Sequence, residues 1–174
     1  MKNIFLIGFM GCGKSTVAVS MAKKHKLSVV EMDQEIEKIE EMSIPAIFEH
    51  KGEAYFRDAE ARLLQDIQKQ DSQVVSCGGG VVLRNENITT MKQGGVVVYL
   101  TAKPETILER VKEDDNRPLL RGNKNISYIC ELMAKREEKY KSAADFTVST
   151  DGKTPEQICE EILLQIKMIG ETIC

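Results

Sequence analysis

A glycine-rich stretch near the start of the chain limits the possible folds more than any other feature. Residues 8–15, GFMGCGKS, fit the pattern G-x-x-x-x-G-K-S/T and directly follow an apolar run. In this pattern glycines let backbone N–H groups turn toward one anion, and a helix that begins near Lys14 adds its positive end. The alternative is an ordinary turn between a strand and a helix. The flanking strand and helix patterns favour a loop that holds the phosphates of a nucleotide.

The same stretch has some features of an export signal. Lys2 precedes the apolar residues 4–10, and Gly11 and Cys12 are small enough for a cleavage site. The apolar run is short, however, and a strand that is buried on both faces gives the same pattern. We therefore expect a first strand at residues 3–7. No run of about 18 apolar residues occurs, so we expect no membrane span.

The charge and the cysteine content argue against several classes of function. The 174 residues carry a formal net charge of -3, so nothing draws the whole chain to nucleic acid or to an anionic membrane. Any bound anion must therefore be held by local charge. The five cysteines are scattered without a Cys-x-x-Cys pair, which argues against a zinc site or a disulfide framework and favours a cytoplasmic location.

Short apolar runs alternate with longer helical patterns along the chain. This alternation is typical of the α/β class with a parallel sheet, and the length favours one domain over residues 1–174. Residues 112–124 interrupt the alternation with a polar segment of mixed charge, which indicates an inserted loop. A capping box at Thr154 and Gln157, with Pro155 in the first turn, predicts where the last helix begins. The predicted strands are residues 3–7, 27–32, 73–77, 95–100 and 146–149, and the other predicted helices are residues 14–25, 33–41, 45–49, 53–69, 85–92, 104–112 and 127–141.

Among proteins with a phosphate loop, the sequence favours a small kinase. A GTPase would need Asn-Lys-x-Asp to recognise its base, and the nearest string, NKNI at residues 123–126, lacks the aspartate. The chain is also short for a motor or a transporter ATPase. Small kinases remain, in which a compact core holds the nucleotide and inserted segments close over an acceptor.

Six motifs, taken in order, resemble those of the shikimate kinase family across nearly the whole chain. They are GFMGCGKST at residues 8–16, MDQEIE at 32–37, SIPAIFEHKGEAYFR at 43–57, CGGGVV at 77–82, RPLL at 117–120 and REEKY at 136–140. Many families share the phosphate loop, whereas the ordered set is much more specific. One alternative is a kinase for another hydroxy-acid such as gluconate, which would lack this glycine triplet and these arginines. The other is a non-kinase regulator that binds ATP.

The resemblance implies both a fold and a reaction. The fold would be a three-layer αβα structure of the P-loop kinase type, with a central five-stranded parallel sheet, an acceptor-binding segment at about residues 33–61 and a mobile lid at about residues 112–124. The reaction would move the γ-phosphoryl group of ATP, with Mg²⁺, to a hydroxyl of shikimate. Its products would be ADP and shikimate 3-phosphate, in aromatic amino acid biosynthesis. The partners would be ATP, ADP and shikimate, with no nucleic acid or membrane, for a cytoplasmic monomer.

The nucleotide site is expected to centre on the phosphate loop. Lys14 is placed to reach the β- and γ-phosphates, and the hydroxyl of Ser15 is a ligand for magnesium. The resemblance adds Arg117 as a lid residue that moves onto ATP, and Arg110 as a contact of the adenine. The expected ATP-binding residues are Gly11, Cys12, Gly13, Lys14, Ser15, Thr16, Arg110 and Arg117.

Asp33 comes directly after the predicted second strand, at the edge of the sheet where α/β proteins bind ligands. Its carboxylate could hydrogen-bond an acceptor hydroxyl and accept the proton, or it could cap the helix that follows. The residues alone leave both interpretations open, and the resemblance implies the acceptor role. The expected catalytic residues are therefore Asp33, Lys14 and Arg117, the last two stabilising charge on the transferred group.

Two arginines are candidates for holding a carboxylate, because the planar guanidinium group matches its geometry. Arg57 and Arg136 could instead be surface residues in helical pairs, with Glu60 near the first and with Tyr140 or Leu132 near the second. The resemblance implies that both hold the carboxyl group of shikimate. The backbone of the glycines that end the third strand can approach a ligand closely. The expected substrate-binding residues are Asp33, Arg57, Gly78, Gly79, Gly80 and Arg136.

The chain departs from the family pattern after the second strand. Family members usually carry Asp-x-Asp there, whereas this chain has Glu31-Met32-Asp33. Glutamate keeps the charge and adds a methylene group. In the family the first aspartate lies near magnesium, often through water, so the resemblance implies Ser15 and Glu31 as the metal ligands, with Glu31 reaching the metal through water, in a different way, or not at all. Cys77 replaces a small hydroxyl residue, and without an evident basic partner it is interpreted as a buried small hydrophobe.

Overall fold

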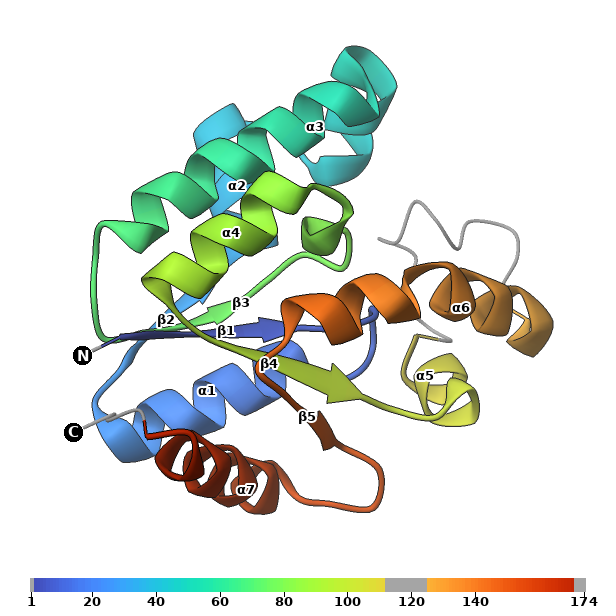
Figure 1. Ribbon diagram of the computed structural model, residues 1–174. Coiled ribbons are helices and arrows are strands. Elements are labelled where there is room, and N and C mark those ends of the chain that lie inside the picture. Colours follow the sequence, from blue (N-terminus) through green and yellow to red (C-terminus); the bar gives the residue numbers. More distant parts are fainter. Residues whose placement is uncertain (1, 112–124, 171–174) are drawn as a thin grey trace.

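The computed structural model describes residues 2–111 and 125–170, which are arranged around one sheet (Figure 1). The sheet has five strands in the order β2-β3-β1-β4-β5, and each pair of neighbours is parallel. The expected α/β fold with a five-stranded parallel sheet is confirmed. The strands are β1 Asn3–Ile7, β2 Ser28–Glu31, β3 Gln73–Ser76, β4 Gly95–Thr101 and β5 Phe146–Ser149.

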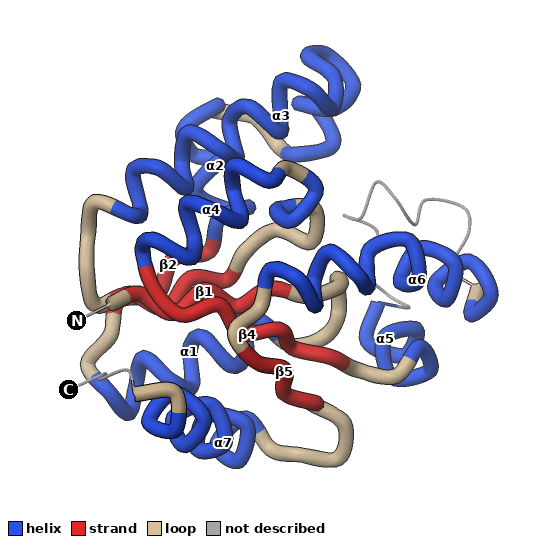
Figure 2. The backbone as a smooth tube through the Cα atoms, viewed as in Figure 1, coloured by secondary structure: helices blue, strands red, loops and turns tan. Residues whose placement is uncertain are grey.

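Helices cover both faces of this sheet, which makes three layers (Figure 2). Helices α2, α3 and α4 lie on one face, α1 and α7 lie on the other, and α5 and α6 lie near the carboxyl ends of the strands. The helices are α1 Lys14–His25, α2 Met32–Glu40, α3 Ile44–Gln68, α4 Asn85–Gly94, α5 Pro104–Val111, α6 Ile126–Ala143 and α7 Pro155–Met168, with a short 3-10 helix η1 at Val81–Leu83.

The central strand β1 contributes to the cores on both faces because its side chains alternate in direction. Ile4 and Leu6 pack into the cluster that contains residues of α1 and α7, and Phe5 and Ile7 pack into the cluster under α3 and α4. Each of these four side chains is buried, and burial of a side chain of this size stabilises the fold by about 1.5–3 kcal/mol. The apolar run before the glycine-rich loop is therefore a strand of the core.

Helix α3 differs most from the predicted elements. The sequence predicts two helices, at residues 45–49 and 53–69, whereas the structure has one element that is kinked at Gly52. Gly52 has φ 82° and ψ 167°, a conformation that glycine adopts without a steric penalty. The two helical parts are thus real, and they meet at this kink.

The start of the last helix follows the predicted chemistry. The Thr154 hydroxyl accepts a hydrogen bond from the backbone N–H of Gln157 at 3.3 Å, and the Gln157 side chain accepts one from the Thr154 N–H at 2.9 Å. The capping box is confirmed. The expected lid, with Arg117, lies outside the described residues. No helix in the described part of the chain is long and apolar enough to cross a membrane.

Candidate active site

The loop between β1 and α1 borders an open pocket of about 520 Å³. Gly11 has φ 76°, and a β-carbon on it would lie 2.8 Å from Cγ1 of Val111, so the loop has no room for a side chain there. Gly13 is the N-cap of α1 with φ 100°, and no side chain caps this end of the helix. The first N–H groups of α1 therefore face the pocket and make it a site for an anion.

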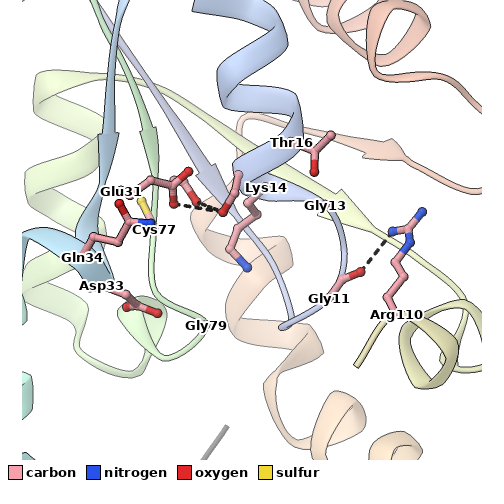
Figure 3. A pocket seen from close by; sticks show the side chains of 12 residues that line it. Gly11, Gly13, Lys14, Thr16, Glu31, Asp33, Gln34, Cys77, Gly79 and Arg110 are labelled. Carbon is pink, nitrogen blue, oxygen red and sulfur yellow. Dashed lines mark hydrogen bonds between the residues drawn. The ribbon is translucent and has the colours of Figure 1, made fainter. Parts of the chain in front are cut away.

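Two cations contact this loop, Lys14 from the start of α1 and Arg110 from α5 (Figure 3). The Lys14 ammonium group donates to the carbonyl oxygens of Gly8 at 2.8 Å and of Phe9 at 3.1 Å. Arg110 donates from Nη1 to the Gly11 carbonyl oxygen at 3.0 Å and to the Thr150 hydroxyl at 3.3 Å. Both positive charges are therefore held beside the space for phosphate. The expected contact of Arg110 with adenine stays a prediction.

Three oxygen-bearing side chains meet where β2, β3 and α1 come together. The Ser15 hydroxyl donates to Oε2 of Glu31 at 2.9 Å and lies 3.3 Å from the Ser76 hydroxyl. The other oxygen of Glu31, Oε1, is buried and has no hydrogen-bond partner among the described residues. The Glu31 carboxylate thus contacts Ser15 directly.

This arrangement fits a magnesium ion that arrives with a nucleotide. Mg²⁺ takes oxygen ligands, keeps several waters and is usually bound through one or two carboxylates plus phosphates. Within residues 2–111 and 125–170 no cluster of three or more His, Cys, Asp or Glu side chains could hold a metal. The Ser15 hydroxyl and the unpartnered oxygen of Glu31 supply ligands of the right kind, and phosphate and water would supply the rest.

Asp33 lines the same pocket from the first turn of α2. The N-cap of α2 is Glu31, so the alternative in which Asp33 caps this helix is wrong. Its Oδ1 lies 3.0 Å from the position that a β-carbon on Gly78 would occupy. Asp33 is therefore packed closely against the glycine triplet, at the carboxyl edge of the sheet.

Each glycine of the triplet lies against a different polar side chain. A β-carbon on Gly78 would approach Glu60 Oε1 to 2.7 Å, and one on Gly80 would approach both terminal nitrogens of Arg57 to 2.4 Å. Arg136 donates from Nη1 to the Gly79 carbonyl oxygen at 3.2 Å. The absence of side chains at 78–80 therefore lets both arginines and two carboxylates gather at the end of β3.

Arg57 is buried, so its interpretation as a surface residue is wrong, although the expected helical pair with Glu60 does form. Its Nη1 donates to Glu60 Oε2 at 3.0 Å, and its Nη2 donates to Glu53 Oε1 at 3.2 Å. Burial raises the pKa of the Glu60 carboxyl, and the nearby charge of Asp33 adds to this, while Arg57 acts in the opposite direction. The two glutamates thus fix the guanidinium group, and its terminal nitrogens also lie beside Gly80.

The comparisons with known proteins agree with this geometry. The family model described as shikimate kinase matches residues 10–167 of the chain. The chain belongs to the shikimate kinase family. A shikimate kinase of Persephonella marina is 48% identical over 96% of this chain and 100% of its own length. One of Sulfurihydrogenibium sp. is 45% identical over 96% of this chain and 99% of its own length.

Solved structures give the same result. The shikimate kinase of Acinetobacter baumannii, in complex with shikimate, is 33% identical with a TM-score of 0.92, and the alignment covers 97% of this chain and 94% of that one. The shikimate kinase of Aquifex aeolicus is 38% identical with a TM-score of 0.83, over 97% and 98% of the two chains. A gluconokinase of Sinorhizobium meliloti is 16% identical with a TM-score of 0.58, which shows a shared fold and no more.

Most of the residues around the pocket are predictable from the sequence, and three are not among the predicted site residues. Gly11, Gly13, Lys14, Ser15, Thr16, Glu31, Asp33, Gly79 and Arg110 all line it, together with Gln34, Ser76 and Cys77, which were not among the expected site residues. Cys12 and Cys77 are buried, as is Tyr140. Burial raises the pKa of the Cys77 thiol, which agrees with its interpretation as a small hydrophobe. The spacing of Glu53 and Glu60 around Arg57 was a usable signal for its two partners.

Proposed function

We propose that this chain transfers the γ-phosphoryl group of ATP to shikimate, giving shikimate 3-phosphate and ADP for aromatic amino acid biosynthesis. The observation that carries the proposal is the glycine triplet, which brings Asp33 and two arginines to the edge of a phosphate-binding loop. Membership of the shikimate kinase family supports it, as does the relative from Acinetobacter baumannii whose structure contains shikimate.

The nucleotide is held mainly by the loop and by the start of α1. Backbone N–H groups from Gly11 to Thr16 bind phosphate oxygens, and Lys14 leaves the loop carbonyls to contact the β- and γ-phosphates. Arg110 contributes positive charge from the opposite side of the loop. By resemblance, Arg117 adds a second cation from the segment outside the described residues.

A divalent cation, Mg²⁺, accompanies ATP and neutralises charge on the phosphates when it is bound. Ser15 and Glu31 would hold it, because both side chains line the same pocket and the serine hydroxyl already contacts the Glu31 carboxylate. Before the ion binds, the hydrogen bond from Ser15 keeps the carboxylate in place. Chelation with EDTA is expected to stop turnover, and added Mg²⁺ is expected to restore it.

The acceptor is held by its carboxylate and activated at its hydroxyl. Arg57 and Arg136 pair with the carboxylate, since guanidinium groups match it with two parallel hydrogen bonds. The triplet Gly78–Gly80 lets the acceptor lie directly against the backbone. Asp33 then hydrogen-bonds the acceptor hydroxyl, orients it toward the γ-phosphorus and takes its proton.

We also propose that the enzyme works as a cytoplasmic monomer without nucleic acid or membrane. One chain supplies every site residue named for the described segments, and the net charge of -3 gives no attraction to polyanions. Sedimentation of the active enzyme at assay concentration tests this, and a mass of twice the chain would contradict it.

The activity is tested by ADP release with Mg²⁺ and ATP in the presence of four additions: shikimate, gluconate, a nucleoside monophosphate, or none. The proposal predicts release that depends on shikimate. Release with gluconate alone would assign the acceptor site to another hydroxy-acid, and release that ignores every acceptor would favour an ATP-binding regulator.

A further inference from the structure

Tyr140 is buried in α6, and its hydroxyl donates a hydrogen bond to the carbonyl oxygen of Gly79. Its ring stacks on Tyr99 of β4, with ring centroids 5.0 Å apart and planes 20° apart. The ring is therefore held on one face by Tyr99, and its hydroxyl is held at the glycine triplet. Tyr140 has no role among those expected for the residues of the site.

The Gly79 carbonyl oxygen accepts a second hydrogen bond, from Nη1 of Arg136 at 3.2 Å. Arg136 and Tyr140 are four residues apart on α6, so both side chains leave the helix on the same side. In the described part of the chain, no hydrogen bond uses the N–H of Gly79 or of Gly80. The triplet thus offers donors to a ligand while its central carbonyl is held by two side chains of one helix.

Pairing with the carboxylate of an acceptor would require one of these two side chains, Arg136, to move. A guanidinium group that pairs with a carboxylate through two N–H groups must turn its fork toward that carboxylate. Arg136 then weakens or loses its bond to the Gly79 carbonyl. Loss of a hydrogen-bond partner from this partly buried carbonyl is costly, and a free peptide plane could rotate and redirect the N–H of Gly80. The Tyr140 hydroxyl prevents both effects because it cannot follow the ligand.

We propose that Tyr140 is a positioning residue for the acceptor: its hydroxyl holds the Gly79 carbonyl while Arg136 moves to the substrate carboxylate. This inference rests on the proposed function and adds a residue to the acceptor side of the site. Tyr140 does not line the pocket beside the phosphate loop, and it acts through Gly79 and Arg136.

The test compares Tyr140→Phe with Tyr99→Phe. Each substitution deletes one phenolic oxygen from the same stacked pair, and only the first removes the bond to Gly79. Tyr140→Phe is expected to raise the KM for shikimate about 5- to 30-fold and to leave the KM for ATP within about twofold. Tyr99→Phe is expected to leave both KM values within about twofold.

A purely structural role predicts a different pattern. Tyr140→Phe that fails to fold, or that weakens ATP and shikimate to the same extent, would assign the hydroxyl to the fold and overturn the proposal. Coupling to Arg136 gives a second readout, because Arg136→Lys removes the planar fork. The double variant that combines Tyr140→Phe with Arg136→Lys is expected to raise the KM for shikimate by less than the product of the two single fold-changes. A rise equal to that product would contradict the coupling between Tyr140 and Arg136.

The outcome for the wild-type enzyme separates this inference from the proposed function. Absence of turnover with shikimate in the wild type would remove the proposed function itself. Wild-type turnover combined with an unchanged KM for shikimate in Tyr140→Phe would remove only the role of Tyr140.

Discussion

Arg57 and Glu60 form a buried ion pair on α3, in which Nη1 donates to Oε2 at 3.0 Å and the side chains are 10% and 0% exposed. An arginine that must bind a carboxylate loses less entropy on binding if its guanidinium group is already fixed. The buried Glu60 holds the guanidinium group in this way, and the exposed Glu53 holds it more weakly. The pair also places the Glu60 carboxyl group close to Asp33 and Gly78.

Removal of Glu60 should therefore be much more damaging than removal of Glu53. Glu60→Ala leaves Arg57 buried without its main partner, and we expect a loss of about 3–5 kcal/mol in the free energy of unfolding. Glu53 is 57% exposed, and Glu53→Ala is expected to cost less than about 1 kcal/mol. Urea denaturation measures both values, and equal losses would contradict the assignment.

The glycine triplet should tolerate side chains unequally. A β-carbon on Gly80 would lie 2.4 Å from two nitrogens of Arg57, which Glu60 prevents from moving away. We expect Gly80→Ala to raise the KM for shikimate at least about tenfold and to leave the KM for ATP nearly unchanged, because a small displacement of a substrate-binding group is costly. Steady-state kinetics with each substrate varied in turn measures this split.

Gly170→Ala is a suitable control for that substitution. Gly170 has φ 78° at the end of α7, and a β-carbon there would meet nothing within 4 Å. Its replacement is expected to cost about 1–2 kcal/mol of stability through backbone strain, with no change in either KM. A similar rise in the KM for shikimate in both variants would show that the effect of Gly80→Ala is not local.

The positions of most helices and strands are predictable from the sequence, because each of these elements has a strong local signal. The apolar run of β1, the glycine-rich loop and the capping box of α7 follow from spacing and backbone preference alone. From the sequence, a helical pair between Arg57 and Glu60 is an alternative to a role of Arg57 in ligand binding. The structure shows that the pair itself fixes the arginine, so the two interpretations are compatible. The sequence could not reveal burial at this position, since burial depends on how α3 packs.

The other features that the sequence does not predict depend on tertiary contacts. Tyr140 and Gly79 are 61 residues apart in the chain, and nothing in the local pattern around REEKY indicates that the tyrosine hydroxyl meets the glycine carbonyl. The meeting of Ser15, Glu31 and Ser76 likewise depends on the strand order, which places β3 between β2 and β1.

The contact between α2 and α3 should make stability depend on pH. Glu40 accepts hydrogen bonds from Lys51 and from the Tyr55 hydroxyl, each at 2.8 Å, and these lower the pKa of its carboxyl below its ordinary value of 4.5. A pKa that is lower in the folded state stabilises the fold above about pH 4.5, and this stabilisation is lost as the pH falls through the folded-state pKa.

Glu40→Gln is therefore expected to lower the free energy of unfolding at pH 7 and to flatten its decline below about pH 4.5. Urea denaturation over the range from about pH 7 to about pH 3 measures this. Glu131→Gln is the control, because Glu131 is 59% exposed and forms an ordinary helical pair with Lys135. A steeper acid decline in Glu40→Gln would contradict the account.

We propose that Asp33 links the phosphate loop to the acceptor site, and a single-turnover experiment with γ-labelled ATP and shikimate tests this role. Wild-type enzyme should transfer the label to shikimate. Asp33→Asn should bind ATP with unchanged affinity and transfer the label about 10²–10⁴-fold more slowly, because the amide cannot accept the proton of the hydroxyl. Transfer by Asp33→Asn at the wild-type rate would contradict the claim.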